Sequence, residues 1–456
     1  MNRSVATRHQ DVYSFRPGAT CVTTPRAAIL LAPPHKEKLP GVTPAQLQAL
    51  KTLNLGPATL DDLSPTGADA DVDTLVGSLA ERGWLAITVR FDGTDLYTIR
   101  PFATPPARPE FVEEERTLSK FTIMRRDKNN IVAENPLSWC DIDIHDPRVL
   151  EVVSGLASPA EPALPDDVSA RLAADLKWAR HTVVDAESED DEFATRSWNA
   201  HELWFHRRSN LSERILTWET FGPTRWADGE FPPLPARKDN YPGDAIALAT
   251  PDIEDLRAVD PSLTDVLEDR VSCRDFDDAA PITLDRLGEL LFRTVRTKSL
   301  RTAKGVEYLS RPYPSGGAVH ELEFYPVVRN VAGLASGMYH YDSFDHVLRP
   351  VADDQVVERL LRTSSLTLSQ GQLPQVLIVI AARSGRLMWT YEQVPYAIIL
   401  KHVGVVLQTI YLVATAMGLG AVAQGYGDTT AFNDAAGVDE LEECNVGSIV
   451  IGAPKR

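Results

Sequence analysis

A run of twenty mostly apolar residues, Gly404 to Ala423, is the feature that most constrains how this chain can fold. The run is long enough to span a bilayer as a helix. It contains Gln408 and Thr409, however, and the chain offers no partner span for it. A helix that is apolar all round can equally lie in the core of a large domain. We therefore predict a buried core helix and no membrane association.

Composition and net charge limit which classes of protein this chain can belong to. The 456 residues are 43% hydrophobic and 24% charged, which is ordinary for a soluble chain of about three domains. The net charge of −18 argues against nucleic-acid binding, which needs clustered basic residues. The four cysteines form no CxxC pair and no signal peptide opens the chain, so we predict reduced thiols and a cytoplasmic location. His201 and His206 have a spacing that suits neither a helix face nor a strand face, so no metal site is predicted.

Residues 1–110 are predicted to hold a winged-helix-like module. Thr43 is an N-cap followed by proline, and a short helix begins near Thr59. A third helix, over 71–82, is predicted from apolar residues at the spacing of one helix face, Val72, Leu75, Val76 and Leu79. Two strands, at 84–90 and 96–100, then flank the hairpin signal Asp92-Gly93.

A second, degenerate winged-helix-like module is predicted at residues 111–190. Its expected elements are strands at 121–126, 131–134 and 140–144 and helices from 147 and over 166–184. In the third strand, Asp141 and Asp143 alternate with apolar residues, which predicts one buried and one solvated face. The acidic run 185–192 is typical of a solvated linker. Residues 191–244, first helical and then proline-rich, are assigned as the linker to the last domain.

Phosphate-binding chemistry is indicated at the start of the last domain. In the segment RVSCRDFDD, Arg270, Ser272 and Arg274 fall at alternate positions, so an extended chain would point all three to one side. Two guanidinium groups and a hydroxyl suit a phosphate or another dianion. The same pattern is also typical of the wet face of a strand.

A glycine turn is the second candidate site. Pro314, Ser315, Gly316 and Gly317 form a tight turn whose bare backbone can approach a planar ligand. We expect this turn to open a helix, so that its N–H groups favour a polar or anionic group. Around it we predict a helix at 284–292 and strands at 322–328, 337–341, 347–348 and 376–382.

Five segments, in this order, resemble the nitroreductase-like flavin dehydrogenases of ribosomal-peptide natural-product pathways: RVSCRDFDD, PSGGAVHELEFYPVV, GMYHYDSFDHVLRPV, AMGLGAVAQGY and VGSIVIGAP. These enzymes are azoline dehydrogenases, such as the cyanobactin oxidases and the enzymes of streptolysin-type pathways. For residues 245–456 the resemblance implies an α+β, nitroreductase-like flavin fold and a homodimer with FMN at the subunit interface. It also implies oxidation of thiazolines or oxazolines of a precursor peptide to thiazoles or oxazoles.

The resemblance further implies which residues bind FMN. Arg270, Ser272 and Arg274 match the phosphate and ribityl motif, and the glycine turn matches the loop against the flavin ring. Gly418, Leu419 and Gly420 match the glycine loop that follows the core helix in these enzymes. Lys455 and Arg456 lie near the position where related nitroreductases place basic residues on the phosphate.

The predicted catalytic residue is Tyr391. Many azoline dehydrogenases have a Lys-Tyr pair before the core helix, but in this chain Thr390 stands where the lysine is expected. Threonine does not titrate near neutral pH, so it cannot act as a general base. Either Tyr391 works alone, or Lys401 or His320 substitutes, or the activity differs. An equal alternative is that Tyr391 only packs at a helix start.

Three functions stay open on this basis. The chain is an azoline dehydrogenase, a general NAD(P)H-dependent flavin reductase or nitroreductase, or a non-catalytic partner that binds a leader peptide. The winged-helix modules resemble leader-recognition modules, and we prefer leader binding by strand addition to the edge of the wing. The alternatives are DNA binding, which the acidic helix 71–82 opposes, and a scaffold for the dimer or for a partner enzyme such as a cyclodehydratase.

Overall fold

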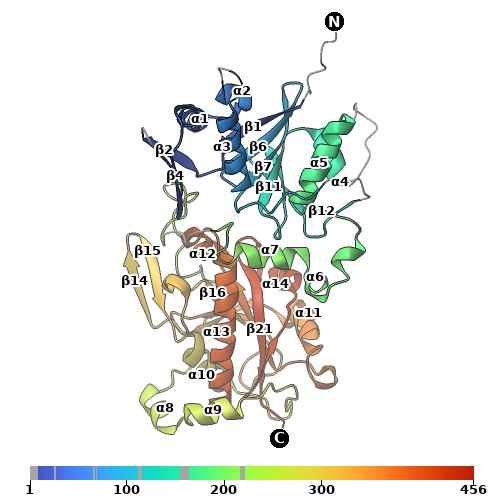
Figure 1. Cartoon of the computed structure of the whole chain (residues 1–456). Coiled ribbons are helices and arrows are strands. Elements are labelled where there is room, and N and C mark those ends of the chain that lie inside the picture. Colours follow the sequence, from blue (N-terminus) through green and yellow to red (C-terminus); the bar gives the residue numbers. More distant parts are fainter. Residues whose placement is uncertain are drawn as a thin grey trace. The chain divides into compact units, whose positions relative to one another are not determined.

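The computed structural model describes residues 9–24, 27–64, 67, 69–110, 116–154, 164–215 and 221–455 (Figure 1). Tertiary contacts divide the chain into two compact units, Met1–Trp218 and Glu219–Arg456. Each unit has its own seven-stranded sheet and its own hydrophobic core.

The sheet of the first unit is antiparallel and has the strand order β5-β1-β6-β7-β11-β10-β9. Its strands are β1 (His9–Phe15), β5 (Ala58–Thr59), β6 (Leu85–Phe91), β7 (Thr94–Pro101), β9 (Ile123–Asp127), β10 (Asn130–Glu134) and β11 (Cys140–Ile144). Two smaller sheets are formed by β2 (Thr20–Thr24), β3 (Ala27–Ala32) and β4 (His35–Pro40), and by β8 (Thr117–Leu118) and β12 (Thr182–Val183). The strands before residue 43 were not predicted from the sequence.

The three predicted N-terminal helices are confirmed as α1 (Pro44–Leu55), α2 (Leu60–Leu63) and α3 (Ala70–Glu81). Thr43 caps α1 in a capping box, because its hydroxyl accepts the Gln46 amide at 3.2 Å while the Gln46 side chain accepts the Thr43 amide at 3.0 Å. The four apolar residues predicted for the core face of α3 are all at most 8% exposed.

The wing is a confirmed hairpin, but neither of its edges is free. β6 and β7 join through Asp92 and Gly93, whose φ angles are 48° and 80°, as this turn requires. All seven residues of β6 pair with β1, and β7 pairs with β11. The prediction that a peptide binds by strand addition to the edge of the wing is therefore wrong, because the backbone groups that it would need are already bonded. The same β7–β11 pairing joins the two predicted modules in one sheet.

The second half of this unit adds α4 (Pro147–Ser154), α5 (Asp166–Trp178), α6 (Phe193–Arg196) and α7 (Ala200–Arg208). The helix expected over 166–184 ends earlier, at Trp178, and the chain continues into β12. The solvated face predicted for β11 is also wrong. Asp141 is only 8% exposed, because Arg214, 73 residues away in sequence, covers it and donates a hydrogen bond of 2.6 Å.

The sheet of the second unit is also antiparallel and has the order β13-β18-β17-β16-β19-β21-β20. Its strands are β13 (Ile246–Ala247), β16 (Leu322–Val328), β17 (Gly337–Asp342), β18 (Val347–Ala352), β19 (Val376–Ala382), β20 (Gly420–Gln424) and β21 (Cys444–Gly452). β14 (Ser299–Ala303) and β15 (Val306–Ser310) form a separate hairpin. The strands predicted at 322–328 and 376–382 are confirmed at both ends.

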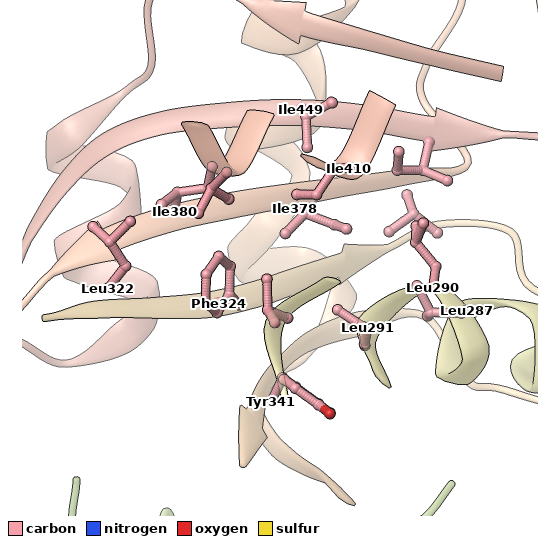
Figure 2. Packing of buried hydrophobic residues seen from close by; sticks show 14 of the residues in the cluster. Leu287, Leu290, Leu291, Leu322, Phe324, Tyr341, Ile378, Ile380, Ile410 and Ile449 are labelled. Atoms are coloured by element: carbon pink, nitrogen blue, oxygen red, sulfur yellow. The ribbon is translucent and has the colours of Figure 1, made fainter. Parts of the chain in front are cut away.

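Helices cover both faces of this sheet. On one face, Phe324, Ile378 and Ile380 pack in a core with residues of α10 (Leu284–Val295) and α13 (Pro395–Ala416), as Figure 2 shows. On the other face, neighbouring residues of the same strands pack with α11 (Asp354–Ser365) and α14 (Thr429–Ala436). Burial on both sides explains why all seven residues of β16 and of β19 are buried. Three short helices complete the unit, α8 (Ile253–Val259), α9 (Leu263–Asp269) and α12 (Ser384–Thr390).

The long apolar run is split between two elements. α13 ends at Ala416, Gly418 turns the chain with a φ of 66°, and β20 begins at Gly420. The core helix predicted in this run is confirmed up to Ala416, and the glycines expected to form a loop after it stand where the chain turns.

Only one face of α13 is in the core. Residues such as Ile399 and Val406 are fully buried, whereas Tyr396, Leu400 and Val405 are 36–42% exposed. By length and composition α13 could cross a membrane, but 39% of its most apolar window is buried inside the unit. The expectation of all-round burial is thus wrong for the outer face of this helix, which is open and carries Lys401 and Gln408 besides these apolar residues.

Candidate functional site

Arg270 and Ser272 meet on Tyr411, near the C-terminal end of α13. The Arg270 guanidinium lies 5.4 Å from the centre of the Tyr411 ring, and Ser272 Oγ lies 3.2 Å from the Tyr411 hydroxyl. That hydroxyl also accepts the Ala423 amide of β20 at 2.7 Å. Two members of the predicted motif therefore share one anchor on the core helix.

The motif then runs beside β20 and the end of the chain. The Cys273 amide donates to the Ala421 carbonyl at 2.9 Å, and the Lys455 amide donates to the Asp275 carbonyl at 3.1 Å. Gly420 permits this approach, because a Cβ there would lie 2.7 Å from Cys273 Sγ. Gly420 is thus covered by the motif rather than open to a ligand, and its role in the structure is to position the motif.

Gly418, Leu419 and Lys455 line one cavity of about 480 Å³, together with Arg286. Gly418 faces open space, with no atom within 4 Å of where its Cβ would be. Arg456, the last predicted phosphate contact, lies outside the described residues.

The donor groups of this region suit a phosphate. Within the described part of the chain, Arg270 and Arg274 have no carboxylate partner, and Ser272 adds a hydroxyl. Lys455 adds an ammonium that lies 3.9 Å from the Asp275 carboxylate. Unpaired guanidinium groups beside a hydroxyl bind dianions well, so these residues fit the phosphate end of FMN.

A buried histidine–glutamate pair holds the glycine turn. The Gly316 amide donates to His402 Nε2 at 2.6 Å, and His402 Nδ1 lies 2.8 Å from Glu321 Oε1. His402 is 6% exposed and Glu321 is fully buried. Because Nε2 accepts from an amide, the ring proton is on Nδ1 and is donated to Glu321. This pair was not predicted from the sequence, where the one signal for it is a histidine inside an apolar helix.

The glycine turn does not open a helix, contrary to the prediction. Gly316–Ala318 form a single 3-10 turn, so no helix dipole is available there. Gly317, Ala318 and His320 have φ angles of 62°, 57° and 48°. Left-handed backbone at two non-glycine residues concentrates strain at this loop, as is common at binding sites.

Phe221 and Tyr391 cover Gly317. A Cβ at this glycine would lie 2.2 Å from Phe221 Cε2 and 3.2 Å from the Tyr391 hydroxyl. The two aromatic rings are 5.7 Å apart, edge to face. The bare backbone thus accepts a planar ring, and in this structure that ring belongs to Phe221. Burial raises the pKa of the Tyr391 phenol above its ordinary value of 10.0, which keeps it protonated at neutral pH.

The other residues considered for proton transfer, Thr390, Lys401 and His320, lie in three different environments. Thr390 is 3% exposed and donates to the Arg386 carbonyl at 3.2 Å, so its hydroxyl is used inside α12. Lys401 lies on the exposed side of α13. His320 is 4% exposed, and burial, assisted by the nearby charge of Arg311, lowers its pKa to about 3. His320 is therefore neutral at physiological pH and a weak base.

The two halves of the predicted site lie on opposite sides of α13. Tyr411, which anchors the phosphate motif, is nine residues beyond His402, which holds the glycine turn. Nine residues are two and a half turns, which is about 14 Å along the helix axis and half a turn around it. One copy of the chain therefore presents the phosphate motif and the glycine turn in different directions.

Comparison with known proteins gives separate matches for the two units. Residues 267–453 match the model of the Nitroreductase family, and residues 116–214 match the model of the cyanobactin oxidase ThcOx. A putative nitroreductase of Methanocaldococcus jannaschii is 34% identical over 183 residues, which are 40% of this chain and 85% of that protein. The trifolitoxin-processing protein TfxB of Rhizobium leguminosarum bv. trifolii is 31% identical over 93 residues, 20% of this chain and 25% of that protein.

One of the solved structures with a similar chain is the E. coli microcin synthetase McbBCD complex with truncated pro-MccB17 bound. The sequence identity is 20% and the TM-score 0.36, over 56% of this chain and 93% of that chain.

Proposed function

Because this chain belongs to the nitroreductase family of oxidoreductases, we propose that it oxidises thiazoline or oxazoline rings of a ribosomally made precursor peptide, with FMN as cofactor. The observation that carries the azoline proposal is the match of residues 116–214 to the cyanobactin oxidase model, in the same chain as the nitroreductase match. The similarity to a trifolitoxin-processing protein also supports peptide processing.

Four residues would hold the phosphate of FMN in this proposal. Arg270, Ser272 and Arg274 supply two guanidinium groups and a hydroxyl, and Lys455 supplies an ammonium from the end of β21. The glycine turn, held by His402, would offer bare backbone to the flavin ring in the place that Phe221 takes over Gly317 in this structure. When bound, FMN supplies the two-electron acceptor that the protein side chains lack.

A second copy of the chain would complete the site. The phosphate motif sits at Tyr411, on the same side of α13 as the exposed apolar residues Tyr396 and Leu400. An open apolar face on a helix is typical of an interface. We propose a homodimer across this face, in which the phosphate motif of one copy and the glycine turn of the other share one FMN.

The chemistry requires two hydrogens to leave the ring. Conversion of an azoline to an azole removes a hydride equivalent and a proton, and the new double bond makes the ring aromatic. Because its pKa is raised, Tyr391 serves as a hydrogen-bond donor to the ring and not as an anionic base at neutral pH. Tyr391 is partly exposed, so water can reach the same place and take the proton.

The visible absorbance spectrum of the purified protein, with mass analysis of released cofactor, tests the FMN site. A flavin spectrum with the mass of FMN is expected, and its loss in the variant Arg270→Gln/Arg274→Gln would assign the phosphate site. The matched control is Arg257→Gln, because Arg257 is an exposed arginine of α8.

An azoline-containing peptide then tests the reaction. The peptide mass should fall by two hydrogens per ring when the protein holds FMN. Oxidation of NAD(P)H with nitro or quinone substrates, without azoline turnover, would favour the general reductase. A colourless protein that does not take up FMN would overturn both enzymatic functions and leave a leader-binding partner.

A further inference from the structure

The first unit contains a cavity of about 300 Å³ that is rich in arginine. Five arginines line it: Arg16, Arg100, Arg125, Arg208 and Arg214. Three acidic residues line it as well: Glu134, Asp141 and Glu213. The lining therefore carries an excess of two positive charges, in a chain whose net charge is −18.

Four of the arginines are fixed by carboxylates. Glu134 accepts hydrogen bonds from Arg125 and Arg208, each at 2.8 Å. Burial opposes ionisation of Glu134, but these two arginines outweigh it and lower the pKa of its carboxyl group. Asp141 accepts from Arg214 at 2.6 Å and lies 3.6 Å from Arg100, whose nearer partner is Asp143 at 3.0 Å. The carboxylates thus hold the guanidinium groups in place, as a preorganised site requires.

Other donors in the cavity are not satisfied. Arg16 has no carboxylate partner in the described part of the chain; its guanidinium makes a long hydrogen bond of 3.4 Å to the Phe102 carbonyl and lies 5.2 Å from the centre of the Trp84 ring. Burial lowers the pKa of Arg16, because the protein offers no compensating charge. Arg214 Nη2 and Arg100 Nε are buried and have no hydrogen-bond partner. These two atoms are covered by the protein, whereas the partly exposed guanidinium of Arg16 can donate to an acceptor that enters this cavity.

A second cavity, of about 370 Å³, adjoins the first. The two share Phe102, Glu213 and Arg214, and the second adds Arg180 and Arg207. The Arg214 guanidinium lies 4.0 Å from the centre of the Phe102 ring and 4.9 Å from that of Trp204, so its plane is fixed between the two cavities. Consecutive side chains of an extended peptide could therefore each meet arginines.

We propose that these two cavities bind an acidic segment of a peptide. One side-chain carboxylate would enter between Arg16 and Arg214, and another would meet Arg180 and Arg207. The carboxylate chemistry follows from Arg16, which has no carboxylate partner in the described part of the chain and lines the cavity with four other arginines, whereas the choice of a peptide as its carrier rests on the proposed function. The excess of positive charge in the lining is small and is spread over two cavities. It therefore suits a ligand with separate single negative charges better than one phosphate dianion.

Binding of fluorescein-labelled pentaglutamate to the full-length, FMN-loaded protein tests the proposal, with labelled pentaglutamine as the matched probe. Non-specific binding of an acidic peptide is disfavoured by the net charge of −18. We expect pentaglutamate to bind and pentaglutamine not to. Arg16→Gln should weaken binding about tenfold or more, because it removes a charge-assisted pair, and Arg16→Lys should restore part of it.

The control variant is Arg126→Gln. Arg126 lies beside Arg125 on β9 but is exposed and does not line either cavity, so its loss removes the same charge without touching the site. An equal loss of binding in Arg126→Gln and Arg16→Gln would overturn the proposal, as would equal binding of both probes or no binding of pentaglutamate. Thermal unfolding midpoints of the variants show that each one is folded.

The outcomes also separate this inference from the proposed function. If pentaglutamate binds through Arg16 while azolines are not oxidised, the acidic-peptide site stands and the proposed reaction fails. If azolines are oxidised and pentaglutamate does not bind, the enzyme stands and this inference is overturned.

Discussion

The Gly316 amide and His402 Nε2 are 2.6 Å apart, and this single hydrogen bond ties the glycine turn to the core helix α13. Glu321 fixes the other side of the same imidazole at 2.8 Å. The position of the turn therefore depends on a ring whose tautomer is set by a buried carboxylate.

His402→Leu should loosen the glycine turn and destabilise the second unit. The variant leaves the Gly316 amide without its acceptor and the buried Glu321 without its partner, which costs about 3–5 kcal/mol in the free energy of unfolding. Urea denaturation and FMN titration measure the two effects.

The double variant His402→Leu/Glu321→Leu separates the loss of stability from the loss of FMN affinity. It removes the unpaired carboxylate, so most of the stability should return while FMN affinity stays low. If His402→Leu binds FMN as the unchanged protein does, the imidazole does not position the turn.

Gly317→Ala should disturb the aromatic cover of the turn. The new Cβ would meet Phe221 at 2.2 Å and the Tyr391 hydroxyl at 3.2 Å, on a backbone with a φ of 62°. We expect a loss of about 2–4 kcal/mol, from strain and overpacking together. Gly371→Ala is the control, because Gly371 has a φ of 68° and nothing within 4 Å, so only the strain of about 1 kcal/mol remains. Equal losses in the two variants would mean that Phe221 and Tyr391 move aside freely.

Tyr391→Phe should lower azoline turnover by about tenfold to a hundredfold without loss of FMN, because it removes a hydrogen-bond donor and keeps the ring. Burial raises the phenol pKa above 10.0, so turnover between pH 6 and 9 should show no step that depends on this hydroxyl. Full turnover in Tyr391→Phe would leave the residue a packing role. A pH-dependent step in turnover that is seen in the unchanged protein and not in Tyr391→Phe would show that Tyr391 acts as a base.

Local patterns predicted the elements of this chain better than their partners. The helix 71–82 and the strand 322–328 follow from apolar spacing within a few residues, and both are confirmed. The closed edges of the wing follow from the pairing of β6 with the much earlier β1 and of β7 with the later β11, which leaves no local signature. Burial of Asp141 by the distant Arg214 was missed for the same reason.

The candidate site shows the same limit. The sequence predicted that Arg270, Ser272 and Gly418 belong to one region, and the structure brings them to the C-terminal end of α13. The pairing of Gly316 with His402 spans 86 residues and depends on how the turn packs on the helix. Spacing along the chain carries no information about such a contact.

The stability of the second unit should fall in acid partly through His320. Its pKa is lowered to about 3 in the folded protein, first by burial and then by the charges of Arg311 and Arg386, against 6.5 in the unfolded chain. The unfolded state therefore binds the extra proton first. The contribution of His320 is complete above pH 6.5 and is lost toward pH 3, at about 1.4 kcal/mol per pH unit.

The variant His320→Asn isolates this contribution, because asparagine tolerates the φ of 48° and does not titrate. Urea unfolding from pH 7 to pH 4 should show a shallower loss in the variant than in the unchanged protein. Parallel curves would mean that His320 is solvated in solution.

Val405→Glu should separate the proposed homodimer and with it the FMN site. Val405 is 36% exposed on the outer side of α13, where a carboxylate from each copy would be desolvated in the proposed interface. Sedimentation velocity should shift from dimer to monomer, and bound FMN should fall in proportion, since the phosphate motif and the glycine turn of one copy face different sides of this helix. Val356→Glu is the matched control, because Val356 is a 47% exposed valine on α11, away from that face. A monomeric Val405→Glu protein that keeps its FMN would contradict this prediction. It would show that the phosphate motif and the glycine turn of a single chain hold the cofactor together.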